Sequence, residues 1–235
     1  PIAVPVNNGY YSQLTSVSGG SVDNVGVSTV VLSIEQVGGS CYRPGNNDFL
    51  GTCPNWFGAS GSTGSWNYVF ATPPWVHNVQ YVVRSSATDL GGNVQTAGVS
   101  ASFTYDVMSP SVAVTVPWSG FVNPAQSVLS GTALDAPADV SSVELAISSD
   151  AGGADASWYS AGTNQFNAGF TAAVYMSTTG FVNASPDQWS LSLTAPEPVQ
   201  GAMEDGKTYL LRARVRDASV PYKETVKDFT LLYDT

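Results

Sequence analysis

The chain has 235 residues, only 11% of them charged, and a formal net charge of −10 at pH 7. Eight Lys and Arg residues cannot build the basic patch that phosphate groups require, so we expect no nucleic-acid partner. No run of about 18 apolar residues occurs, so we expect no membrane insertion, and short alternating apolar runs between Gly, Pro and Asn residues predict an all-β protein.

The N-terminal part of the chain reads as short strands followed by a long loop. Residues 2–6 predict an edge strand, because Pro5 has no amide hydrogen to donate to a ladder. Strands are expected next within residues 14–23 and 27–34. In the loop that follows, Cys41 and Cys53 lie twelve residues apart, without zinc-type spacing or a nearby His, so we predict a disulfide. A disulfide places the protein in an oxidising, extracellular compartment.

The same loop region is rich in aromatic residues set among Gly, Ser and Asn. Rings in such surroundings can stack on sugar rings while the polar neighbours bind hydroxyl groups. Trp66 has a counterpart in the second half, Trp189, and both are expected in the core. Trp56 and Trp75 have no clear aromatic counterpart, so they are the candidate glycan-binding residues, together with Tyr42.

The segment 81–93 closes the first half of the chain and returns in the second half. Tyr81, Arg84 and Asp89 each recur 128 residues later, at Tyr209, Arg212 and Asp217. The offset between the halves is 112 near their beginnings and rises to 128 without reversal, so insertions alone separate two copies of one module. We predict domains at residues 1–108 and 109–235, with a short joint at 106–110 that limits their swing.

At the intermediate offset of 117, the two cysteines of the first copy correspond to aromatic residues of the second. Cys41 aligns with Trp158, and Cys53 aligns with Phe170. The pattern predicts one structural clamp made in two ways, covalent in the first copy and by contact between Trp158 and Phe170 in the second.

Several motifs occur in the same order in both halves. They are Ser-Gly-x-x-x-Asp (Ser18 to Asp23, Ser130 to Asp135), Val-x-Leu-x-Ile (Val30 to Ile34, Val143 to Ile147) and Tyr-x-x-Arg-x-x-Ala-x-Asp-x-x-Gly-Asn, complete only in the first copy. With these motifs the chain resembles the bacterial immunoglobulin-like repeats of modular cell-surface and extracellular proteins. The resemblance implies two tandem immunoglobulin-like β-sandwich domains with Greek-key topology, and spacer, adhesive or envelope-structural roles rather than an enzyme.

In such a sandwich, the loop after the second strand and the loop before the last strand lie at the end where the chain enters. We therefore expect Asp135 and Asp217 to face the joint that carries Asp106. Calcium prefers oxygen ligands, so these three aspartates are a candidate calcium site. The competing interpretation is that each Asp ends a strand and accepts hydrogen bonds from nearby backbone amides. Asp23 and Asp89 are the equivalent pair of the first copy.

The remaining motifs favour a structural role. His77 is the only histidine, and no Gly-x-Ser-x-Gly elbow accompanies it, so we assign no catalytic residue and do not expect an enzyme. We expect a structural or adhesive segment of an extracellular bacterial surface or filament-type protein, acting as a rigid spacer or assembly module. Its partners would be neighbouring modules or copies of the same protein. The alternative is a carbohydrate-binding accessory module of a secreted protein.

Overall fold

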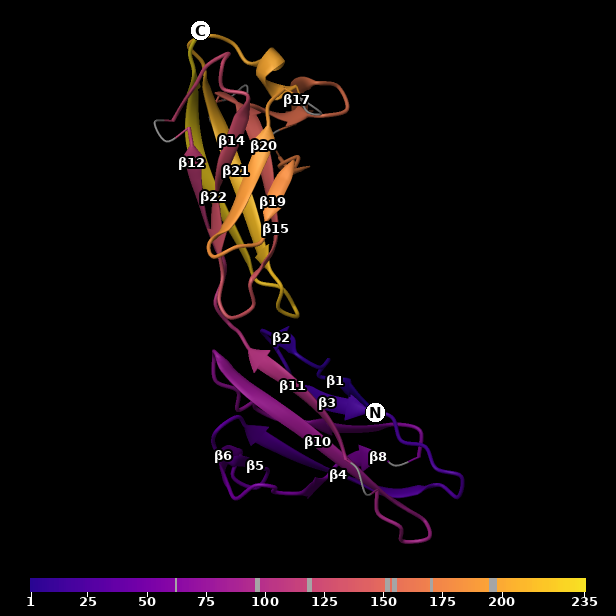
Figure 1. The fold of residues 1–235 in the computed structure, drawn as a ribbon. Coiled ribbons are helices and arrows are strands. Elements are labelled where there is room, and N and C mark those ends of the chain that lie inside the picture. Colours follow the sequence, from indigo (N-terminus) through magenta and orange to yellow (C-terminus); the bar gives the residue numbers. More distant parts are fainter. Residues whose placement is uncertain are drawn as a thin grey trace. The chain divides into compact units, whose positions relative to one another are not determined.

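Figure 1 shows the fold of the chain in a computed structural model. The structure describes residues 1–61, 63–95, 98–117, 120–150, 153, 156–169, 171–194 and 198–235. Two compact units divide the chain. Unit 1 comprises Pro1–Met108 and Ser219–Tyr222, and unit 2 comprises Ser109–Ala218 and Lys223–Thr235. The predicted all-β class is confirmed, because the described elements are strands with one short 3-10 helix, η2 (Val199–Ala202). No described helix is long and apolar enough to cross a membrane.

Unit 1 is a sandwich of two sheets (Figure 1). The smaller sheet has the order β1 (Ile2–Val4), β3 (Ser16–Gly19), β9 (Trp66–Val69) and β8 (Ser60–Gly61). The larger sheet has the order β2 (Gly9–Tyr11), β11 (Val99–Tyr105), β10 (Val79–Asp89), β4 (Val27–Gln36), β5 (Cys41–Arg43) and β6 (Asp48–Gly51), and β7 (Phe57–Gly58) also pairs with β4.

Unit 2 repeats this arrangement strand for strand. Its smaller sheet has the order β12 (Ser111–Val116), β14 (Val128–Leu134), β20 (Asp187–Ser192) and β19 (Gly180–Val182). Its larger sheet has the order β13 (Phe121–Val122), β22 (Glu224–Tyr233), β21 (Thr208–Asp217), β15 (Val140–Ser149), β16 (Ser157–Ser160) and β17 (Gln165–Gly169), and β18 (Met176–Ser177) also pairs with β15.

The order of the strands is that of an immunoglobulin-like Greek key. If the main strands of unit 1 are lettered along the chain, β1, β3, β9 and β8 become A, B, E and D, and β11, β10 and β4 become G, F and C. These are the two sheets of the immunoglobulin fold. The apolar residues form two separate core clusters, one in each unit. The predicted pair of tandem immunoglobulin-like sandwiches is therefore confirmed.

Each core is closed by a tryptophan that lies across a glycine of the neighbouring strand. Trp66 pairs in register with Gly19 in unit 1, and Trp189 pairs with Gly131 in unit 2. Both indoles are buried, as predicted. A Cβ atom added to either glycine would overlap the indole ring and a backbone carbonyl oxygen, that of Pro1 just before β1 or that of Ala113 in β12. Glycine is therefore required where the ring passes closest to the strand.

A second feature that both units share is a buried tyrosine near the start of β10 in unit 1 and of β21 in unit 2. The hydroxyl oxygen of Tyr81 accepts a hydrogen bond from the amide of Val76 at 2.9 Å. The hydroxyl oxygen of Tyr209 accepts one from the amide of Glu204 at 2.7 Å. This is the tyrosine corner of immunoglobulin-like domains, in which the ring fills the core and the hydroxyl fixes the preceding loop. This hydrogen bond explains why the repeated sequence motif begins with Tyr in both halves of the chain.

We predict that Gly131→Ala lowers the free energy of unfolding of unit 2 by about 1–3 kcal/mol, the usual cost of overpacking a core. The added methyl group must displace the Trp189 ring or the edge strand. Chemical denaturation followed by tryptophan fluorescence measures the effect. Gly162→Ala is the matched control, because a Cβ atom there meets nothing within 4 Å. Equal stabilities of the two variants would contradict the Gly–Trp packing.

Candidate ligand and metal residues

Two of the three candidate glycan-binding aromatics lie in the core of unit 1, so the premise that they are exposed is wrong. Trp75 is 8% exposed, and its ring lies 4.8 Å from the Phe70 ring and 5.0 Å from the Tyr81 ring between centroids. Its Nε1 atom donates a hydrogen bond to the carbonyl oxygen of Leu14 at 2.6 Å. A buried ring that is engaged on both its apolar and polar sides cannot stack on a sugar from solvent.

Tyr42 is also a core residue. It is 2% exposed and contacts a cluster of four aromatic rings, those of Phe49, Phe57, Tyr68 and Phe70. Its hydroxyl group donates to Oδ1 of Asn47 at 2.9 Å, so the polar end of the ring is satisfied within the same loop. Burial raises the pKa of this phenol above its usual value, because the charged form would lose its hydration. Sequence spacing alone could not separate these inward-facing rings from Trp56.

Trp56 remains accessible, with 44% of its surface exposed. The residues on either side of it are fixed. Asn55 donates through Nδ2 to the carbonyl oxygen of Tyr42 at 2.7 Å, and Phe57 pairs with Leu32 of β4. The indole is therefore presented to solvent from a backbone that two neighbouring contacts hold in place.

The predicted disulfide between Cys41 and Cys53 is present. Cys41 is fully buried in β5, where it pairs with Glu35 of β4, and the Cα atoms of the two cysteines are 5.1 Å apart. The bond ties the long aromatic loop to the outer strands of the larger sheet. Closing a loop of twelve residues in this way contributes roughly 3 kcal/mol in the chain-entropy model.

Unit 2 places an aromatic residue where unit 1 has the buried cysteine. Trp158 of β16 pairs with Ser148 of β15, just as Cys41 pairs with the equivalent position of β4. The Trp158 ring is fully buried, and the guanidinium carbon of Arg212 lies 5.3 Å from its centroid. The predicted contact of Trp158 with Phe170 lies outside the described residues, because Phe170 is not among them.

The charged side chains on the larger sheet of unit 2 form cross-strand pairs. Glu144 of β15 lies 2.7 Å from Arg214 of β21, and Arg216 lies 2.7 Å from Glu224 of β22. The guanidinium carbon of Arg214 also lies 3.7 Å from the centroid of the Tyr175 ring. These charges compensate one another on the sheet surface, where each exposed pair contributes at most about 1 kcal/mol.

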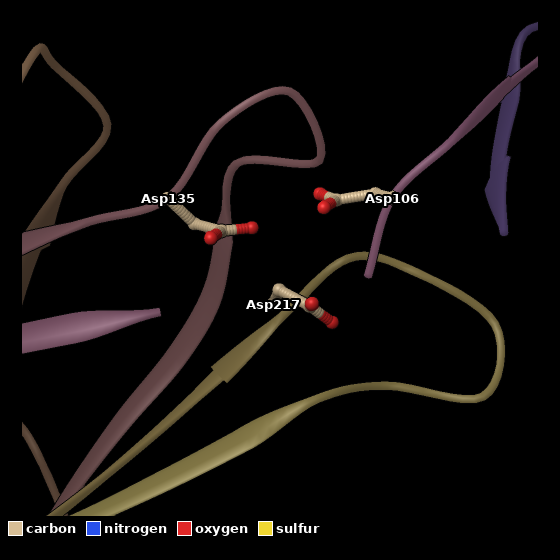
Figure 2. Close-up of side chains that lie close together, drawn as sticks. All are labelled: Asp106, Asp135 and Asp217. Atoms are coloured by element: carbon tan, nitrogen blue, oxygen red, sulfur yellow. The ribbon is translucent and has the colours of Figure 1, made fainter. Parts of the chain in front are cut away.

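The three candidate calcium ligands are shown in Figure 2. Asp135 and Asp217 both belong to unit 2, and one carboxylate oxygen of each lies within 4.8 Å of the other. The Oδ1 atom of Asp217 accepts a hydrogen bond from the amide of Lys223 at 2.8 Å. This agrees in part with the competing interpretation, in which each Asp ends a strand and accepts hydrogen bonds from backbone amides. Asp106 belongs to unit 1. Its Oδ1 atom accepts a hydrogen bond from the amide of Met108 at 3.0 Å and lies 3.2 Å from Nδ1 of His77.

Two further carboxyl groups of unit 2 were not singled out from the sequence. Asp187 is 1% exposed at the start of β20, and its Oδ1 atom accepts a hydrogen bond from the amide of Ala184 at 2.8 Å. Burial raises the pKa of Asp187, and the neighbouring carboxylate of Asp139 adds to the rise. No sequence pattern indicated that Asp139 and Asp187 are neighbours, because they lie 48 positions apart and belong to no shared motif.

No family model matches the sequence, and no curated protein matches it. The solved structures that it resembles include a tetra-tandem repeat in the extending region of a large adhesion protein (16% identity, 98% of this chain and 48% of that chain, TM-score 0.31). Another is a segment of two fibronectin type III domains from chicken tenascin. It has 10% sequence identity, the match covers 99% of this chain and 96% of that chain, and the TM-score is 0.29. A third is a Ca²⁺-stabilised adhesin that helps an Antarctic bacterium bind ice. It has 13% sequence identity, the match covers 93% of this chain and 43% of that chain, and the TM-score is 0.28. This chain thus spans about half the length of the two adhesion-protein chains.

Proposed function

We propose that this chain is a structural or adhesive segment of an extracellular bacterial surface or filament-type protein, in which each unit is a load-bearing module. Its work is to carry spacing and surface contacts, and it needs no reacting group for that. Neighbouring modules, or copies of the same protein, would be its partners.

The observation that carries this proposal is the parallel pairing of the second strand with the last strand in each unit. In unit 1, β2 runs parallel to β11, with Gly9 opposite Phe103 and Tyr11 opposite Tyr105. In unit 2, β13 runs parallel to β22, with Phe121 opposite Leu232. Tension on the two ends of a module pulls such strands along their length in opposite directions. Ladder hydrogen bonds lie across that direction, so several of them must break together rather than one after another.

Unit 1 has additional bonds across the same pair of segments. The amide of Asn8 donates to the carbonyl oxygen of Ser102 at 2.8 Å, and the amide of Asp106 donates to the carbonyl oxygen of Tyr11 at 2.8 Å. The Oδ1 atom of Asn7 accepts a hydrogen bond from the amide of Ser102 at 3.0 Å. These bonds join β2 and its flanks to β11, which favours a module that resists extension.

The disulfide supports an extracellular setting for this module. Disulfides persist in oxidising compartments and are rare in the cytoplasm. The same bond shortens the length of chain that can be released when unit 1 unfolds, because the segment between Cys41 and Cys53 cannot extend while it is intact.

Pulling single molecules of the 235-residue chain by its ends should give two separate unfolding events. Reduction should lengthen one of them by roughly 35–40 Å, since twelve residues span at most about 3.3–3.6 Å each and the Cα atoms start 5.1 Å apart. Asn7→Ala should lower the unfolding force of the disulfide-containing unit alone, with Asn24→Ala as the exposed control. Extension without a resolved force peak would contradict the load-bearing function.

A second candidate function, carbohydrate binding, is favoured by the exposure of Trp56 beside the disulfide. A flat exposed ring on a fixed backbone can stack on a sugar at little cost in conformational entropy. If this function holds, an array of glycans should retain the wild-type chain, and Trp56→Ala should weaken binding at least about tenfold, corresponding to about 1.4 kcal/mol. Leu50→Ala is the control, because Leu50 is an exposed apolar residue of β6, within the segment that the disulfide closes. Equal retention of both variants would exclude Trp56 as the binding residue.

We also propose that Asp135 and Asp217 bind a calcium ion, with Asp106 as a third ligand of the ion. The support for this is the short distance between the first two carboxylates within unit 2, and the sequence position of Asp106, three residues before Ser109, where unit 2 begins. Calcium takes six to eight oxygen atoms, so backbone carbonyls and waters would complete the shell.

If calcium binds, millimolar calcium should raise the melting temperature of the chain, because a ligand that binds only the folded state stabilises it by mass action. Asp217→Asn should remove most of this rise. Asp205→Asn should leave it intact, because Asp205 accepts its hydrogen bond from Thr235, outside the proposed ligand set. A melting temperature that is the same in calcium and in chelator would refute the proposal.

A further inference from the structure

One end of unit 1 exposes a group of large apolar side chains. We call it the entry end, and it consists of residues 20–26, which follow β3, and residues 89–95, at the end of β10. Val22 is 88% exposed and Leu90 is 69% exposed, and Val25 and Val94 are also more than half exposed. A patch of this kind on a secreted module marks a surface that contacts another protein surface.

A cavity of about 390 Å³ opens at the same end, between the two sheets. Its buried lining comprises the apolar residues Val27, Val30 and Trp66 together with Ser85, whereas Val22 and Val94 of the patch line it closer to the solvent. The volume falls within the range of sites that accept an apolar group. The entry end therefore combines an exposed apolar surface with a space that an apolar side chain could fill.

The turns that surround this cavity are held in place by their own hydrogen bonds. The Oδ1 and Oδ2 atoms of Asp89 accept hydrogen bonds from the backbone amide and the side-chain amide of Asn93, at 2.8 and 2.7 Å. The Oδ1 atom of Asp23 accepts one from the amide of Val25 at 2.9 Å. Because these turns are already ordered, a partner that docks here loses less free energy in ordering them.

The internal duplication indicates which kind of partner fits. Val22 and Asp23 correspond to Leu134 and Asp135 of unit 2 at an offset of 112, and Asp89 corresponds to Asp217 at an offset of 128. In unit 2 this is the end at which the chain arrives, because Ser111 at the start of β12 pairs with Leu134. Residues 107–110 lead from Asp106 directly into β12, so the chain enters unit 2 at this end.

We infer that the entry end of unit 1 docks a further β-sandwich module of the same design, covalently joined ahead of it, with an apolar side chain of that module entering the cavity. This inference rests on the proposed function, because a load-bearing chain transmits force through such module ends. The entry end supplies the apolar patch, the preformed turns and the cavity.

A three-module chain tests the inference, with residues 1–112 placed directly ahead of Pro1. The offset of 112 then sets Pro1 where Ala113 stands in the natural joint, so the added copy is joined as unit 1 is joined to unit 2. The 235-residue part alone carries isotope labels. Paramagnetic relaxation by a soluble probe reports the solvent exposure of its methyl groups.

The methyl groups of Val22 and Leu90 should be strongly relaxed in the 235-residue chain. In the three-module chain their relaxation should fall toward that of buried methyls such as those of Val17. Val22→Asp and Leu90→Asp should each restore relaxation at the remaining patch residues, because a charge cannot be buried there without a partner. Leu50→Asp is the matched control, since Leu50 is 71% exposed on β6, and it should change nothing at the entry end.

Unchanged exposure of Val22 and Leu90 in the three-module chain would overturn the inference. It would also be overturned if these methyls became protected in the 235-residue chain as its concentration rises, because a second chain copy would then be the occupant. Either result leaves the force measurement on the two existing units unaffected, so the failure of docking and the failure of the load-bearing function can be told apart.

Discussion

The packing of one indole ring against one glycine sets the geometry of each sandwich. Trp66 and Trp189 lie across Gly19 and Gly131, and their Nε1 atoms donate to Gly20 and Thr132, residues that correspond at the offset of 112. A buried aromatic side chain removes roughly 150–250 Å² from water, which is worth at most about 4–6 kcal/mol at 25 cal/mol per Å². The ring can be buried here only because the opposing strand offers no side chain at the point of contact.

The two units share their core devices and differ in what surrounds them. Tyr81 and Tyr209 fix equivalent loops through equivalent hydrogen bonds, whereas the outer strands are secured by a disulfide in unit 1 and by a buried Trp158 with its Arg212 neighbour in unit 2. Both solutions hold the fifth strand of the larger sheet against its neighbour. Positions between the two sheets are restricted by packing in every direction, whereas the outer strands can be secured by different chemistry.

On the larger sheet of unit 2, positive and negative side chains largely neutralise one another. The Arg residues of β21 are paired with Glu144, Glu224 and Asp228, so this face offers little net charge to a polyanion. Carboxylates gather instead at strand ends, among them Asp135, Asp187 and Asp217. Burial, together with the neighbouring carboxylate of Asp139, raises the pKa of Asp187.

The sequence by itself determined the all-β class, the duplication, the disulfide and the inward position of Trp66 and Trp189. These features depend on patterns along the chain: period-2 alternation, an offset between the halves that rises without reversal, and cysteine spacing without other metal ligands.

Only the tertiary structure decided which aromatic residues face solvent. Trp56 and Trp75 are alike in sequence terms, yet Trp75 fills the space between the sheets, where its Nε1 atom meets the carbonyl oxygen of Leu14 from 61 residues away. Likewise, Asp139 and Asp187 become neighbours only because β15 and β20 begin at the same end of unit 2. Burial and proximity of this kind depend on contacts between distant strands, and local patterns along one strand carry no information about them.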